Sequence, residues 1–200
     1  MTETTTNKQQ IAWQFLQKNL NYQGDFAKFH TPTTAPDANF GFPCSRQTAA
    51  DSAAQKWGLL SFCNPRLLNA EQRPFWSIAP TLEAEAIPDG QTPLLPMVRR
   101  SGAAISGLLL LDGDLILRIE RGMKTAQLRI KNGRSFNEET CVALRLPVDL
   151  SLPVNLTKGL DLWNIVSGER SQKVENQIKR IMASCFASLT ACLPKRAIAR

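Results

Sequence analysis

The sequence predicts an α+β protein in which N-terminal helices, a small antiparallel sheet and C-terminal helices follow one another along the chain. Three observations predict this class. Apolar residues recur at helical spacing from residue 8 to about residue 21. They alternate with polar residues in three successive runs between residues 115 and 146, as in strands with one polar face. They return to helical spacing from residue 152 onwards, where we expect helices that cover the apolar face of the sheet.

The N-terminal region is expected to hold two helices. The first runs from residue 8 to about residue 21, and its apolar pattern continues through a break near Gly24. Three prolines and one glycine predict a loop over residues 31–43. Ser45 can then cap a second helix over residues 46–57. Further on, Pro74-Phe75-Trp76 is expected to cover the core as an aromatic plug.

A linker or long loop is expected over residues 88–96, because three prolines and one glycine fall within that stretch. It divides the chain into two predicted regions. Residues 1–87 form an N-terminal helical, aromatic-rich region, and residues 97–200 form an antiparallel sheet with basic C-terminal helices.

The sheet is expected to be a meander. Residues 104–111 are mostly apolar and predict a buried strand, and Asp112-Gly113 after them is a strong hairpin signal. The alternating runs follow, with Asn132-Gly133 as a further turn. Period two in consecutive runs favours antiparallel neighbours.

Two helices are expected after the sheet. The first spans roughly residues 152–168. The second has the clearest helical stripe in the chain. This stripe comprises Val174, Ile178, Ile181, Met182, Cys185, Phe186 and Leu189.

The positive charge of the chain is concentrated at its C-terminal end. Residues 169–200 contain seven cations and two acids, whereas the rest of the chain contains 17 cations and 15 acids. A local basic excess attracts polyanions or an acidic partner, although a solvated helix surface also explains it. The candidate nucleic-acid-binding residues are Lys179, Arg180, Lys195, Arg196 and Arg200.

No constellation in the sequence supports an enzyme. His30 is the only histidine, so neither a catalytic triad nor a histidine-rich metal site can be built. No glycine-rich phosphate loop is present, and we expect no cofactor and no metal. The odd number of cysteines, five, argues against a disulfide framework. The chain also lacks an N-terminal secretory pattern and any long apolar run, so we expect no membrane contact and a cytoplasmic location.

The tryptophans and the basic residues of the predicted sheet each allow two interpretations. The four tryptophans, Trp13, Trp57, Trp76 and Trp163, could stack on bases, but their apolar contexts favour core packing. Five cations could form a basic face on the sheet or lie on an ordinary solvated face. These are Arg118, Arg129, Lys131, Arg134 and Arg145.

Several segments resemble the proteobacterial transcriptional-regulator-like domain proteins. Residues 12–19 (AWQFLQKN), followed by Tyr22 and Phe26, resemble the opening of that family. Residues 54–59 with Asn64-Pro65 and Pro74-Phe75-Trp76 resemble its second signature. The strands around residues 111–113 and the helix over residues 156–168 resemble its following domain. Residues 177–193 and 195–199 match the lead-in to a helix-turn-helix-like unit and the first helix of that unit.

The resemblance implies a non-enzymatic regulator of transcription, because members are often encoded on integrative and conjugative elements. There, activators and antiactivators control excision and transfer. Such a regulator would contact duplex DNA through its basic C-terminal helical unit. The sequence ends before the expected recognition helix, so binding to DNA alone should be weak or non-specific. The alternative is a protein-binding antiactivator or modulator subunit that acts through a regulatory protein partner.

Overall fold

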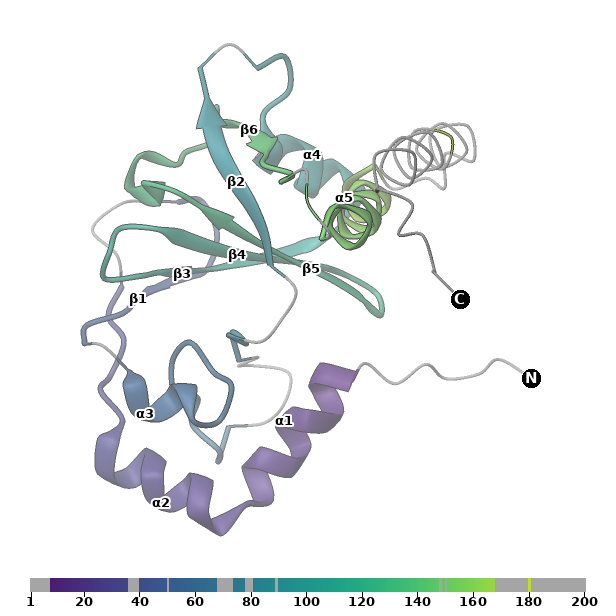
Figure 1. Cartoon of the computed structure of the whole chain (residues 1–200). Helices are drawn as coiled ribbons and strands as arrows, with labels where there is room; N and C mark the ends of the chain where they lie inside the picture. Colours follow the sequence, from purple (N-terminus) through teal and green to yellow (C-terminus); the bar gives the residue numbers. More distant parts are fainter. Residues whose placement is uncertain are drawn as a thin grey trace, which may run out of the picture.

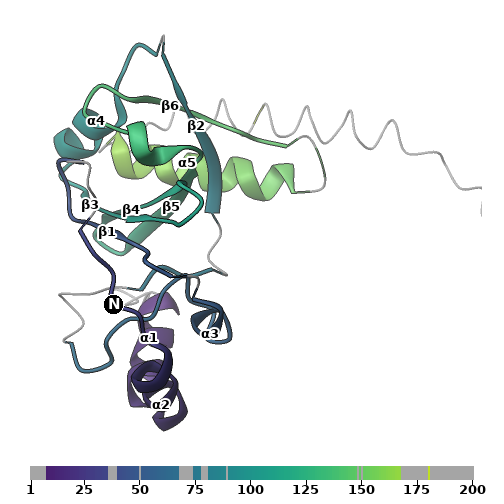
Figure 2. The same cartoon turned by 90° about the vertical axis from the view of Figure 1, so that its left-hand side faces the viewer.

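A six-stranded sheet forms the centre of the molecule in the computed structural model, with helices on both of its faces (Figures 1 and 2). The structure describes residues 8–35, 40–49, 51–67, 74–77, 81–88, 90–147, 149, 151–167 and 180. Helices α1, α2 and α3 lie below the sheet in Figure 1, and α4 and α5 lie on its other side. The helix expected over residues 174–189 lies outside the described residues, apart from Arg180.

The first helical pattern folds as two helices, α1 (Lys8–Lys18) and α2 (Leu20–Phe29). The break falls at Asn19 and not near Gly24, which lies inside α2. Asn19 has an extended backbone, and its side-chain oxygen accepts hydrogen bonds from the backbone N–H groups of Asn21 and Tyr22 at 2.9 and 3.2 Å. A side-chain cap of this kind satisfies N–H groups that a new helix leaves unpaired, so the asparagine starts α2.

The predicted helix over residues 46–57 is wrong. Residues Cys44–Arg46 form strand β1, and only Ser52–Gln55 is helical, as the short helix α3. Arg46 is drawn into the sheet because it pairs in parallel register with Leu109 and forms a bridge with Thr34. The helix instead begins after Asp51, whose carboxylate accepts a hydrogen bond from the Ala54 N–H at 3.3 Å. Long-range strand pairing has overridden a local capping signal.

The sheet is mixed and not antiparallel as predicted, with the order β1-β3-β4-β5-β2-β6. Strands β3 (Ala104–Leu109), β4 (Leu115–Arg121) and β5 (Lys124–Ile130) form the predicted antiparallel meander. Strand β2 (Thr81–Ile87) was not predicted. It lies parallel to β5 and antiparallel to β6 (Cys141–Leu144), so it separates the two strands expected to be neighbours.

The first hairpin follows its sequence signal. Asp112-Gly113 forms the turn between β3 and β4, and Gly113 has φ of 90°. Only glycine adopts this backbone conformation without strain, which explains the residue type at the turn.

Helices α4 (Leu94–Ser101) and α5 (Leu152–Val166) cover one face of the sheet. Part of the expected linker is therefore the first turn of α4, where Pro96 is tolerated because helix N-terminal N–H groups have no intrahelical partner. The α5 helix agrees with its predicted range. The division into residues 1–87 and 97–200 stays a prediction, although β1 and β2 from the first part pair within the sheet.

Two hydrophobic cores lie on opposite faces of the sheet. The larger one packs Leu115, Leu117 and Ile119 of β4 against α4 and α5. The smaller one collects Trp13, Tyr22 and Trp76 with neighbours from α1, α2 and α3. The rings of Trp13 and Trp57 both meet Tyr22 edge-on, with centroids 5.9 and 5.6 Å away. The aromatic plug at Trp76 thus belongs to this second core, as expected.

Candidate interaction surfaces

Of the five predicted nucleic-acid-binding residues, the structure describes Arg180 alone. Arg180 is exposed. Lys179, Lys195, Arg196 and Arg200 lie outside the described residues. Their joint action on DNA stays a prediction.

The cations of the sheet are largely engaged with acids. Arg129 donates to Asp114 at 2.7 Å and to Asp112 at 2.9 Å, and the hydrogen bond to Asp114 raises the pKa of Arg129. Arg145 lies 3.5 Å from Glu85. Lys131 and Arg134 are exposed. Because neighbouring carboxylates neutralise much of this face, it offers a weaker field to phosphates than its sequence suggests.

Arg118, the fifth of these cations, is buried and joins the sheet to the segment around Pro74. Its Nη1 donates to the Pro74 carbonyl at 3.2 Å, and its guanidinium lies 4.8 Å from the centroid of the Phe75 ring. Gln127 beside it donates to the carbonyl of Trp76 at 3.1 Å and to Thr81 Oγ1 at 2.8 Å. These buried polar groups are structural, since each donates to the segment that covers this face of the sheet.

Large apolar side chains are exposed on the N-terminal helices. Ile11 is 37% exposed, Phe15 74% and Leu20 80%. Ile11 and Phe15 are four residues apart and share one side of α1, and Leu20 opens α2 directly after the break. We call these three residues the α1–α2 apolar face. Exposed large apolar side chains on consecutive elements are typical of interaction sites.

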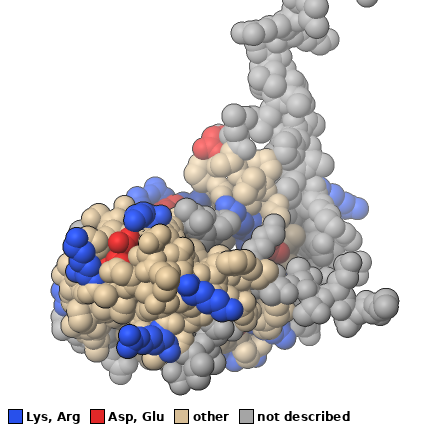
Figure 3. Space-filling model, turned by 90° about the horizontal axis from the view of Figure 1, so that it is seen from below, with Lys and Arg blue, Asp and Glu red and all other residues tan. Residues whose placement is uncertain are grey.

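The surroundings of the α1–α2 apolar face are basic. The described residues between 8 and 67 include six cations but only two acids, Asp25 and Asp51. Asp25 binds Lys56 at 2.9 Å, which lowers the pKa of this carboxyl, and Asp51 accepts from the backbone of Ala54 and Phe62. Seen from below in Figure 3, blue lysine and arginine side chains outnumber red acidic ones on a largely uncharged surface.

A second apolar surface lies beside α5. It is a groove of about 220 Å³ between α4, α5 and strands β5 and β6, which we call the α5 groove. Its lining consists of Thr92, Leu94, Met97, Leu128, Val142, Leu144, Gly159, Leu162, Trp163 and Val166. Trp163 lies at this groove and is 39% exposed, so its predicted place in the core is wrong. Trp13 and Trp76 are buried as predicted, and Trp57 is half-buried with its Nε1 donating to Asp25 at 3.0 Å.

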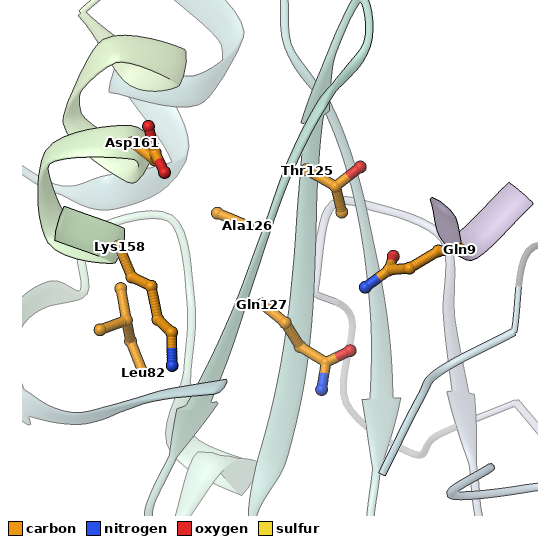
Figure 4. A pocket seen from close by; sticks show the side chains of 7 residues that line it. All are labelled: Gln9, Leu82, Thr125, Ala126, Gln127, Lys158 and Asp161. Carbon is orange, nitrogen blue, oxygen red and sulfur yellow. The ribbon is translucent and has the colours of Figure 1, made fainter. Parts of the chain in front are cut away.

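A smaller, polar pocket of about 180 Å³ lies where α1, β5 and α5 come close (Figure 4). Lys158 and Asp161 from α5 lie on one side of β5 and point in different directions, and Gln9 from α1 lies on the other side. The Gln127 amide is already used by Trp76 and Thr81. The pocket therefore does not aim a nucleophile and a base at one point, as a catalytic site requires.

Burial shifts the pKa values of two cysteines and the histidine away from their reactive ranges. Burial raises the pKa of Cys63 to about 12 and that of Cys44 to about 11, which keeps both thiols protonated. Burial also lowers the pKa of His30, whose ring stacks on Phe26 at 4.4 Å between centroids. Within the described part of the chain, no three histidine, cysteine or acidic side chains gather closely enough to hold a metal ion.

Comparison with known protein families matches residues 4–62 to the proteobacterial transcriptional regulator-like domain. The matched segment contains α1, α2, β1 and α3, and with them the whole α1–α2 apolar face. The match indicates a regulatory role. No curated protein matches the chain. Among the helices of the described residues, none combines the length and the apolar character needed to cross a membrane.

Proposed function

We propose that this protein is a non-enzymatic regulator of transcription that acts by binding a protein partner through the α1–α2 apolar face. The observation that carries the proposal is the exposure of Phe15 and Leu20, at 74% and 80%, inside the segment that matches the regulator-like domain. Burying one such side chain stabilises a complex by roughly 1.5–3 kcal/mol. Two anchors of this size are typical of the centre of a protein interface.

The partner should have an apolar pocket with an acidic rim. Lys18 follows Phe15 at helical spacing on α1 and is exposed, and Lys28 is exposed on α2. The two acids in this part of the described chain are occupied by Lys56 and by backbone N–H groups. An acidic rim would therefore meet positive charge around the apolar anchors, which favours association and fixes its orientation.

Contact with DNA through the basic C-terminal residues is the second candidate function. It is supported by the surplus of positive charge in residues 169–200 and by the exposure of Arg180. The resemblance to regulators of integrative and conjugative elements adds a mobile-element context. Phosphate contacts position a protein but carry little sequence information, so such binding would act together with the partner.

Substitutions on α1 and α2 test the first function. Phe15→Ser with Leu20→Ser should abolish regulation of a reporter promoter in the native host and leave the unfolding midpoint nearly unchanged, because both side chains are already exposed. Gln14→Ser with Asn21→Ser changes two exposed polar residues of the same helices and is the matched control. Full regulation by the Phe15/Leu20 variant would refute the protein-contact proposal. Loss of regulation on replacing Lys195 and Arg196 alone would favour the second candidate function, contact with DNA.

A further inference from the structure

The α5 groove has the lining of a helix-binding site. Leu128, Val142 and Leu144 come from β5 and β6, while α4 and α5 contribute the remaining apolar side chains. Gly159 is one of the lining residues of α5, and because it has no side chain the wall of the groove is low at that position. A volume of about 220 Å³ accommodates a few apolar side chains and not a whole helix. An amphipathic helix lying across the opening, with its apolar side inward, fits such a groove.

The sequence itself supplies a segment of this chemistry directly after α5. The stripe from Val174 to Leu189 is apolar at helical spacing, and a stripe of that length needs a partner surface. Residues 168–173 connect it to Ser167, at the end of α5 beside the groove residue Val166. Six extended residues span up to roughly 20 Å, whereas the groove residues of α5 cover about 10 Å of helix. The connection is long enough for the chain to turn back along α5.

We propose that residues 174–189 bind as a helix in the α5 groove of the same chain. Residues such as Phe186 and Cys185 then face Trp163 and Met97. At helical spacing, Lys173 and Arg180 fall on the side opposite the stripe, so docking leaves both cations directed to solvent. This assignment does not depend on the proposed role in transcription. It gives the groove an occupant and gives the basic C-terminal segment a fixed attachment to the sheet.

A cysteine pair in the full chain tests the contact. Met97→Cys places a thiol in the groove, and the native Cys185 lies on the stripe. Cys192→Ser removes the other cysteine that follows α5 in the sequence. A disulfide forms only when the two Cα atoms come within roughly 7 Å. Under mild oxidation at low protein concentration, peptide mass spectrometry should show the link from position 97 to Cys185 within one chain.

Two controls define the outcome. Arg100→Cys puts an exposed thiol on the same helix but outside the groove lining, and its yield should be at least about tenfold lower. Phe186→Asp should remove the Met97→Cys link, whereas Ser184→Asp, off the stripe in the same segment, should preserve it. Equal yields at positions 97 and 100 would overturn the proposal. A link found only between two chains would also overturn it and assign the groove to a second copy. An unchanged yield in the Phe186→Asp variant would show that the stripe does not enter the groove.

Discussion

Replacement of Tyr22 by phenylalanine should destabilise the protein strongly although it removes a single oxygen atom. Tyr22 is fully buried, and its hydroxyl donates to the Cys63 carbonyl at 2.7 Å and accepts from the Cys63 N–H at 3.1 Å. The ring contacts with Trp13, Trp57 and Phe62 remain in the variant. The cost therefore comes from the two backbone groups of Cys63, which lose their partner inside the core.

The size of this destabilisation follows from the free-energy cost of leaving buried polar groups without hydrogen-bond partners. Each polar group left without a partner costs about 1–3 kcal/mol, and two groups are left, so we expect a loss of roughly 2–6 kcal/mol in the free energy of unfolding. Urea unfolding measures this loss as a lower midpoint at unchanged slope. Thr157→Val, which removes an exposed hydroxyl from α5, is the control and should change stability by less than about 0.5 kcal/mol. A Tyr22→Phe cost as small as the control would refute the reasoning.

The same residue predicts a pH dependence. Burial is the largest cause that raises the pKa of Tyr22 above its ordinary value of 10.0. The folded protein therefore keeps the phenol protonated at a pH where the unfolded chain releases the proton. Its stabilising contribution is complete below pH 10 and decreases as pH rises above that value. Tyr22→Phe should lack this part of the alkaline loss, which unfolding curves between pH 9 and pH 11 would reveal.

Three further predictions concern the glycines and the charged segment. Gly159→Ala should stabilise the protein by about 0.5–1 kcal/mol, because among the described residues an added Cβ inside α5 meets only Leu144 Cδ1, at 3.5 Å. Gly133→Ala should lower the free energy of unfolding by roughly 2 kcal/mol or more, since its Cβ would overlap the Leu115 Cβ and lie 2.8 Å from the Leu115 backbone nitrogen. Urea unfolding measures both glycine variants, and equal midpoints would contradict these two packing arguments. Lys195→Ala with Arg196→Ala should weaken the salt dependence of duplex DNA binding. The slope of log K against log salt concentration should become less negative by up to about two, because each phosphate contact contributes about −0.9. DNA binding whose affinity does not change with salt concentration would exclude phosphate contacts by Lys195 and Arg196.

The sequence predicted those parts of the fold whose signals are local. The meander of β3, β4 and β5 needs only alternation and short turns, and α5 needs only helical periodicity. Strand β2 was missed because its alanines and glutamates favour helix as readily as strand. It becomes a strand by pairing on both edges, with β5 about 45 residues away and with β6 about 60 residues away. No local pattern contains those partners.

The candidate surfaces were hidden for a related reason. The helical pattern expected from residue 8 to about residue 21 placed six residues on one apolar stripe: Ile11, Ala12, Trp13, Phe15, Leu16 and Leu20. In the structure Trp13 enters the core while Phe15 is exposed. Residues 11, 12, 13, 15 and 16 cover more of a helix circumference than one packed face can bury, and this excess breadth was the available signal. The exposure of Trp163 could not be predicted from the local sequence either, because the positions of α4 and β6 decide which side of α5 is covered.

The cross-strand neighbours Arg118 and Gln127 connect the sheet to the segment that packs beside the N-terminal helices. Both side chains leave the sheet on the face away from α5 and donate to carbonyls of Pro74 and Trp76, next to the core formed by α1, α2 and α3. Buried donors that lose their acceptors are costly, so these hydrogen bonds resist separation of the segment Pro74–Trp76 from the sheet, and Trp76 packs in the core with the N-terminal helices. The α1–α2 apolar face and the α5 groove therefore keep a fixed orientation on opposite sides of one sheet. A partner bound at the first and a basic segment attached at the second would be held at a defined spacing, which suits a regulator that brings a protein and DNA together.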